Sequence, residues 1–169
     1  TLQAAYNAAG DFAIISVSGG TYTGQLNANG TKRVVWLGEM GGSNGPAVLS
    51  RNANADTVAL YATTVMDGFV FTHAPDNTGR GLYLGKHSNL VDAPRIRISN
   101  SLIKGNTAAT GAAIYNQNTM LELIHCTVIE NLATGTEALI YNEQPTASTR
   151  VINSIVWNAG QTAPELRDG

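Results

Sequence analysis

The sequence predicts an all-β solenoid, in which each turn of the chain adds short strands to parallel sheets. Residues 96–160 carry one motif three times, as NSLIKGN from Asn100, HCTVIEN from His125 and NSIVWNA from Asn153. The copies are spaced by 25 and 28 residues, and each period holds two short apolar runs. A repeat of this length built from such runs is typical of solenoids, because each turn buries its apolar side chains only against its neighbours.

Composition agrees with many short strands joined by tight polar turns. Hydrophobic residues make up 43% of the 169 residues, charged residues only 13%, and there are 18 glycines. This length suits one domain with a sizeable core. Glycine, asparagine and threonine are abundant, and they favour turns between strands.

The charge and the apolar pattern exclude several classes of protein. The net charge is −2 and no cluster of lysine and arginine occurs, so we expect no nucleic-acid or polybasic membrane surface. No apolar run approaches the roughly 18–20 residues of a membrane span, and no signal peptide opens the sequence. The single cysteine, Cys126, excludes an internal disulfide and a cysteine-based zinc site, and we expect it in the core.

In chain order, the first expected element is a helix at residues 2–9, with Leu2, Ala5, Tyr6 and Ala9 on one face and Gly10 after it. We expect this helix to cover the first coil, because an open solenoid end exposes apolar core. Short β-rich runs bounded by turn residues then predict strands, with a turn expected at 18–24. These expected strands are residues 12–17, 33–37, 47–50, 57–61 and 68–72.

The whole chain is predicted to be a single domain of about six or seven coils. Residues 1–10 form the cap, 11–95 irregular coils, 96–160 regular repeats and 161–169 a C-terminal tail. Loops at 38–46, 74–80 and 85–94 interrupt the early coils. The triplets GLY, AIY and LIY, which end at Tyr83, Tyr115 and Tyr141, are expected to stack as one strand column.

Alignment of the repeats predicts a register between neighbouring coils. Ile98, Leu123 and Val151 form an apolar column, and Arg97, Glu122 and Arg150 form the charged column beside it. This alternation is the period-two pattern of a strand with one buried face. Strands about 4.8 Å apart would place Glu122 between two guanidinium groups. The plain interpretation is a solvated face that avoids like-charge stacking; the alternative is a contact surface for a ligand or partner.

A further column contains Asn100, His125 and Asn153 at an expected turn. Asparagine adopts left-handed backbone angles and caps turns, and stacked asparagines can bond from coil to coil. We therefore expect His125 to replace an asparagine in a structural ladder rather than to act as a base. Asn116 and Asn142, which end GAAIYN and EALIYN, are expected to form a second such ladder.

Lys104, Ile129 and Trp157 should form an outward column on the following strand. An exposed apolar strip of this kind can contact a sugar ring or another protein. The alternative is that a loop at residues 143–149 covers it.

The strings NSLIKGNTAATGAAIYN and NSIVWNAG resemble the repeats of the right-handed parallel β-helix proteins of bacterial surfaces, a family with a pectate-lyase-like fold. The opening LQAAYNAAG, IISV and GGTYTG, and the later MDGFVFTH, are similar to that family in the same order. The resemblance implies a right-handed single-stranded parallel β-helix, and secretion or display on a bacterial cell surface. It specifies fold better than function, because the repeated residues are structural.

Proteins of this fold include polysaccharide lyases and glycosidases, so we searched for catalytic groups. Acidic residues are scattered and no facing carboxylate pair is evident. The best catalytic set is Asp67, His73, Arg97 and Lys104, whose arrangement the sequence leaves open. No histidine spacing indicates a metal site, and no cofactor is expected; Ca²⁺ at turns is possible through three side chains. These are Asp76, Asn77 and Asp92.

The sequence thus predicts a non-catalytic extracellular or cell-surface module with a structural or adhesive role. Expected partners are a glycan, a protein surface, or further copies joined through the solenoid ends into a filament. The alternative is a carbohydrate-active protein, either a polysaccharide lyase or a glycan-binding relative.

Overall fold

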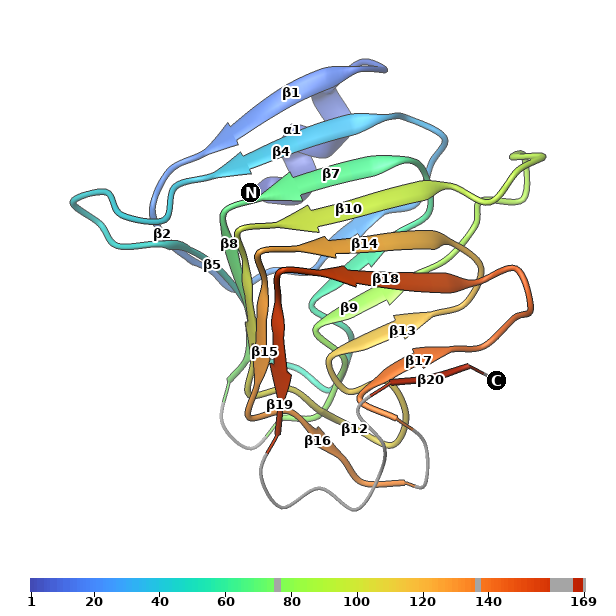
Figure 1. Cartoon of the computed structure of the whole chain (residues 1–169). Helices are drawn as coiled ribbons and strands as arrows, with labels where there is room; N and C mark the ends of the chain where they lie inside the picture. Colours follow the sequence, from blue (N-terminus) through green and yellow to red (C-terminus); the bar gives the residue numbers. More distant parts are fainter. Residues whose placement is uncertain (75–76, 136–137, 159–165, 169) are drawn as a thin grey trace.

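A computed structural model describes residues 1–74, 77–135, 138–158 and 166–168. The described chain forms a parallel β-helix with three six-stranded sheets, and one strand of each coil belongs to each sheet (Figure 1). In Figure 1 each coil runs leftward through the first sheet, downward through the second and rightward through the third, while advancing toward the viewer. This sense is right-handed, as expected for parallel crossovers.

All three sheets are parallel throughout and in register from coil to coil. Sheet A contains β1 (Ala13–Val17), β4 (Val34–Gly38), β7 (Thr64–Asp67), β10 (Arg95–Ser99), β14 (Met120–Ile124) and β18 (Ser148–Ile152). Sheet B contains β2 (Gly20–Tyr22), β5 (Ala47–Arg51), β8 (Phe69–His73), β11 (Leu102–Lys104), β15 (Thr127–Ile129) and β19 (Ile155–Trp157). Sheet C contains β3 (Leu26–Ala28), β6 (Val58–Leu60), β9 (Leu82–Leu84), β13 (Ile114–Asn116), β17 (Ile140–Asn142) and β20 (Leu166–Asp168). A fourth, two-stranded sheet pairs β12 (Thr107–Ala108) with β16 (Leu132–Ala133).

The N-terminal helix is confirmed as α1 (Leu2–Ala8), which packs against β3 of the first coil. The Thr1 side chain accepts a hydrogen bond from the Ala4 amide and so caps the helix. Leu2 and Tyr6 are buried and belong to the main core cluster. The helix therefore covers apolar side chains of the first coil, as the sequence predicts.

The core lies between the three sheets and is filled by the inward-facing residues of each strand. Its largest fully buried side chains include Trp36, Met66, Phe69 and Phe71. In the regular repeats Ile98 pairs with Leu123, and Leu123 pairs with Val151, so the predicted apolar column is confirmed. Its first two members are buried, whereas Val151 on the last described coil is 39% exposed.

The early coils contain more regular structure than the sequence pattern indicates. The stretch predicted as a turn at 18–24 includes the strand β2, and the unpredicted β3 and β7 complete the coils around it. Gly20 begins β2 with a φ of 134°, a conformation that side chains rarely adopt, and the Gly19 amide donates to the Glu39 carboxylate at 2.7 Å. The strand thus depends on contacts from the next coil, which local propensity does not register.

The predicted C-terminal tail also contributes to the solenoid. Leu166–Asp168 form β20, which pairs in parallel with β17 of sheet C. The strands β18, β19 and β20 each lie at one end of their sheet. The last described coil therefore has a neighbour on only one side.

Candidate functional site

The corner between sheets A and B is built by the predicted asparagine column. Asn100, His125 and Asn153 have φ values of 47°, 53° and 47°, so all three adopt the left-handed conformation that this tight corner requires. The Asn100 amide donates to the Asp67 carboxylate at 2.7 Å, and Asn153 Nδ2 lies 3.3 Å from His125 Nε2. These side chains join one coil to the next, and His125 occupies an asparagine position.

The second predicted ladder is confirmed inside the molecule. The Asn116 side-chain amide donates to Asn142 Oδ1 at 2.9 Å, and both residues are buried. Asn116 Oδ1 also accepts from the Thr119 amide and hydroxyl. Because these polar groups have partners in the adjacent coil, their burial stabilises the stack instead of opposing it.

A third ladder, which the sequence analysis missed, runs through the corner between sheets B and C. His73 Nδ1 lies 3.0 Å from Asn106 Oδ1, and Asn106 Nδ2 donates to Asn131 Oδ1 at 2.8 Å. The Asn131 amide donates to Asn158 Oδ1 at 2.7 Å. The three asparagines end the repeated motifs at spacings of 25 and 27 residues, which is the signal that would have revealed them.

The structure does not bring the best catalytic set together. Asp67 accepts hydrogen bonds from Ser99 and Asn100 at the A–B corner, whereas His73 is buried at the other end of sheet B. Arg97 lies on the outer face of sheet A and Lys104 on that of sheet B. Each group takes part in a local contact or faces a different surface.

Cys126 is a core residue, as expected. It is 2% exposed, and its Sγ lies 3.3 Å from the Ile98 carbonyl oxygen. Burial raises the pKa of the Cys126 thiol, which keeps it protonated. The Ser154 hydroxyl accepts from the Cys126 amide, so this small-residue column also connects coils.

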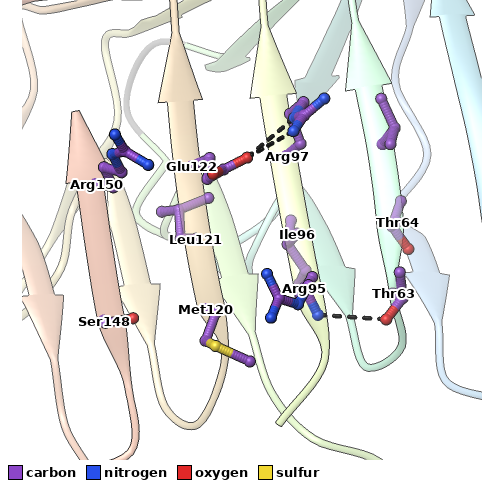
Figure 2. Close-up of a pocket in the computed structure, with 11 residues that line it drawn as sticks. Thr63, Thr64, Arg95, Ile96, Arg97, Met120, Leu121, Glu122, Ser148 and Arg150 are labelled. Carbon is purple, nitrogen blue, oxygen red and sulfur yellow. Dashed lines mark hydrogen bonds and ion pairs between the residues drawn. The ribbon is translucent and has the colours of Figure 1, made fainter. Parts of the chain in front are cut away.

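The outer face of sheet A carries a groove of about 430 Å³ (Figure 2). The predicted register is confirmed, because Arg97 pairs with Glu122 and Glu122 with Arg150 on successive strands. Arg97 Nη2 donates to Glu122 Oε2 at 2.8 Å, and Nε donates to the same oxygen at 3.1 Å. Glu122 thus pairs with one of its two arginine neighbours.

Two further arginines border this groove without an ion pair in the part of the chain that the structure describes: Arg95 and Arg150. Arg95 contributes its backbone amide to the Thr63 hydroxyl at 3.3 Å, which leaves the exposed guanidinium group available (Figure 2). Met120 adds apolar surface between the charged side chains, and Val65 on β7 adds more beside Arg97. The groove therefore combines cationic and apolar surface.

The outer face of sheet B carries the predicted strip of Lys104, Ile129 and Trp157, which are in register on successive strands. Trp157 is 63% exposed, and Ile155 on the same strand is 61% exposed. The alternative in which the loop at 143–149 covers the strip is wrong. The loop instead lies against the preceding coil at the corner between sheets C and A, where Thr146 donates to Asn118 Oδ1 and the Ser148 amide to the Thr119 carbonyl.

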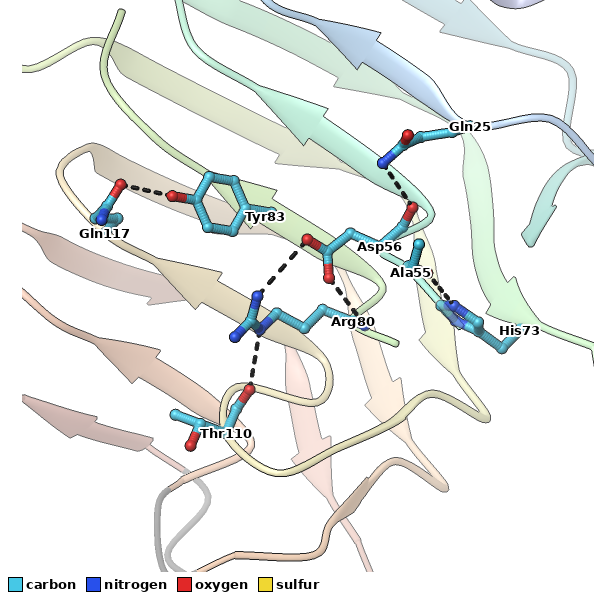
Figure 3. A network of polar contacts seen from close by, with 8 residues as sticks. All are labelled: Gln25, Ala55, Asp56, His73, Arg80, Tyr83, Thr110 and Gln117. Carbon is cyan, nitrogen blue, oxygen red and sulfur yellow. Dashed lines mark hydrogen bonds and ion pairs between the residues drawn. The ribbon is translucent and has the colours of Figure 1, made fainter. Parts of the chain in front are cut away.

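The outer face of sheet C holds an aromatic column next to an ion pair between Arg80 and Asp56, which Figure 3 shows together with Tyr83. The predicted stacking of Tyr83, Tyr115 and Tyr141 is confirmed, and their ring centroids are 5.7 and 5.6 Å apart. Arg80 lies 4.2 Å from the Tyr115 ring and 3.6 Å from the Asp56 carboxylate. Burial raises the pKa of Tyr115, and the hydrogen bond that its hydroxyl donates to the Glu143 carboxylate acts in the same direction.

The rings of Tyr83 and Tyr115 stack face to face, the Tyr141 ring is tilted by 49° against that of Tyr115, and the Arg80 guanidinium group lies over the Tyr115 ring. Tyr83 also donates to Gln117 Oε1 at 2.5 Å, which ties it to the following coil. The repeat pattern aligns the tyrosines, but Arg80 and Asp56 lie in turns that no periodic pattern marks, so the sequence did not predict their place beside the column. The cluster holds coils together.

Among the described residues, no group of three His, Cys, Asp or Glu side chains lies close enough to hold a metal ion. Asp76, one of the possible Ca²⁺ ligands, lies outside these residues. No helix in the described ranges is long and apolar enough to cross a membrane.

Compared with known protein families, curated proteins and solved structures, the chain matches none of them. The resemblance to the pectate-lyase-like proteins therefore rests on the quoted motifs and on the shared architecture of stacked parallel sheets.

Proposed function

We propose that this chain is a non-catalytic β-solenoid module of a bacterial secreted or cell-surface protein, with a structural and adhesive role. One observation carries the proposal: the side chains best suited to acid–base or nucleophilic chemistry are engaged in bonds between coils. His73 is 6% exposed, with Nδ1 beside Asn106 and Nε2 2.7 Å from the Ala55 carbonyl oxygen. A general base must reach the proton that it removes, and this imidazole faces protein on both nitrogens.

The same holds for Cys126 and Asp67. Cys126 is buried and its thiol pKa is raised, while Asp67 accepts bonds from the next coil. Such contacts give a rod stability and a fixed spacing between its faces, which suit a structural unit.

A lyase assay tests the proposal. The protein is incubated with acidic polysaccharides, with and without Ca²⁺, and the absorbance of unsaturated product is followed beside a known lyase. We expect no product above the buffer blank. Product that forms in proportion to protein concentration, and disappears in an Asp67→Asn or His73→Gln variant, would overturn the non-catalytic reading.

A second candidate, the binding of an acidic glycan, is favoured by the groove on sheet A. Arg95 and Arg150 offer guanidinium groups, which match carboxylates in geometry and charge. Val65 and Met120 supply apolar surface for the C–H face of a sugar ring. Binding without cleavage would give the module its adhesive role.

End-to-end assembly is a further part of the proposal. Among the described residues, β18, β19 and β20 are the end strands of their sheets, and Val151, Ile155 and Trp157 on the first two are exposed. Unpaired parallel strands bind other strands readily. Sedimentation velocity over a hundredfold concentration range tests this: we expect larger species at high concentration, and a single monomeric boundary throughout would exclude it.

A further inference from the structure

The groove on sheet A has a charge pattern with a defined period along the solenoid axis. Arg97, Glu122 and Arg150 occupy the same column on three consecutive strands, β10, β14 and β18. Parallel strands lie about 4.8 Å apart, so the two arginines are anchored about 9.6 Å apart, with a carboxylate midway. Sites along this face therefore alternate in sign as positive, negative, positive.

The unpaired cations lie obliquely across the groove and are spaced more widely. Arg95 lies two residues before Arg97 on β10, and Arg150 lies on β18, two strands away. Two strand spacings and two residues of strand rise place these anchors about 12 Å apart. Arg97 already donates twice to Glu122, so Arg95 and Arg150 are the groups left to meet a ligand's anions.

The surface between these cations suits a sugar chain. Met120 on β14 provides aliphatic surface between the two arginines, Val65 on β7 extends it beside Arg97, and the hydroxyls of Thr63 and Ser148 lie at the same groove. A pyranose ring presents both C–H faces and hydroxyl groups, and one sugar unit spans roughly one strand spacing. A linear glycan that crosses the sheet obliquely from Arg95 toward Arg150 would thus place successive sugars over the successive strands β10, β14 and β18.

We propose that this groove selects a linear acidic glycan that carries a carboxylate on alternate sugars. Carboxylates on alternate sugars meet Arg95 and Arg150, while the uncharged sugar between them lies over Glu122. A contiguous polyuronate brings a further carboxylate against Glu122, and that like-charge contact is unfavourable. This inference rests on the proposed glycan binding and adds the charge pattern of the ligand.

Nucleic acid is the less suitable polyanion for this face. Its phosphates are contiguous, so a strand along the axis also meets Glu122. The whole chain has a net charge of −2, which opposes the long-range attraction on which nucleic-acid binding depends.

The test compares two oligosaccharides of equal length by titration calorimetry at low salt: one alternates glucuronate with N-acetylglucosamine, and the other is oligogalacturonate. We expect the alternating glycan to bind several-fold more tightly. Arg150→Gln and Arg95→Gln should each weaken it roughly fivefold, the size of one exposed ion pair. Lys86→Gln, which removes a cation in the loop after β9 and outside the groove, is the matched control and should leave both affinities unchanged.

Glu122→Gln distinguishes selection from general charge attraction. It should strengthen oligogalacturonate binding more than binding of the alternating glycan, so that the affinity ratio falls toward one. Circular dichroism and melting curves confirm that each variant is folded, which is expected because all four side chains lie outside the core.

The outcomes separate the two claims. If neither glycan binds, the glycan-binding function fails and this inference fails with it. If both bind equally, or Glu122→Gln leaves the ratio unchanged, the charge pattern is overturned while glycan binding stands. Tighter binding of single-stranded DNA than of either glycan would also overturn the proposal.

Discussion

Replacing Asn131 with alanine tests how much the buried ladder between sheets B and C contributes to stability. The Asn131 side chain makes four hydrogen bonds. Its Oδ1 accepts from the backbone and side-chain nitrogens of Asn106 at 3.2 and 2.8 Å. Its Nδ2 donates to the carbonyl oxygens of Ile103 and Ile129 at 3.0 and 2.9 Å. Alanine removes all four and leaves their partners in a region where Asn131 itself is 2% exposed.

Each such bond contributes about 1 kcal/mol net, so we expect Asn131→Ala to lower the free energy of unfolding by about 4 kcal/mol. For a chain of this size, that loss corresponds to a decrease of roughly 8–16 °C in Tm. Urea denaturation followed by circular dichroism gives the free energy, and a thermal scan gives Tm. If the free energy of unfolding falls with urea concentration at the same slope in the variant and the original protein, both unfold in the same transition and the two values can be compared.

The control is Asn89→Ala in the exposed loop after β9, where the side chain is at the surface. Exposed substitutions of this kind change stability by less than about 0.5 kcal/mol. A loss below about 1 kcal/mol for Asn131→Ala, or one no larger than that of the control, would refute the ladder as a main source of stability.

Three other predictions concern single side chains. A hydrogen-bonded ion pair with Arg33 lowers the pKa of Asp11 to about 2 from its usual 3.8, so the stabilising effect of the pair is present above about pH 4 and is lost as the pH falls toward 2. Asp11→Asn should therefore lower Tm at pH 7 and flatten the dependence of Tm on pH between pH 4 and 2. An unchanged dependence would contradict the pairing. Trp157 is 63% exposed, whereas Trp36 is fully buried. After Trp157→Phe the remaining tryptophan fluorescence comes from Trp36, and acrylamide should quench it poorly. Strong quenching of that fluorescence would place Trp36 in contact with solvent. Cys126 should react with Ellman's reagent only after unfolding in urea, because burial both shields the thiol and raises its pKa; fast labelling of the native protein would contradict this.

The repeats allowed register to be predicted residue by residue, even though the later coils differ in length. Arg97, Glu122 and Arg150 lie on consecutive strands as the alignment requires, and Asn100, His125 and Asn153 share the left-handed corner. The reason is that identical turns close a coil in the same way each time. Residues at equal positions in the motif must then stack about 4.8 Å apart.

Tertiary structure decided what the motif pattern does not encode. Glu122 bonds to Arg97 and leaves Arg150 unpaired, a choice between two equally spaced neighbours that depends on side-chain geometry. At the start of β2, the Gly19 amide donates to Glu39 of the next coil, and the strand pairs with β5; local sequence propensity registers neither contact. Exposure of Trp157 depends on the path of a loop that packs elsewhere.

By itself, then, the sequence determined the solenoid, its register and the columns that face outward, because these follow from a chain repeating its own turns. Only the folded chain decided which outward charges remain unpaired and which apolar strip stays exposed. Those properties arise from contacts between segments far apart in sequence, and the candidate groove is built from them.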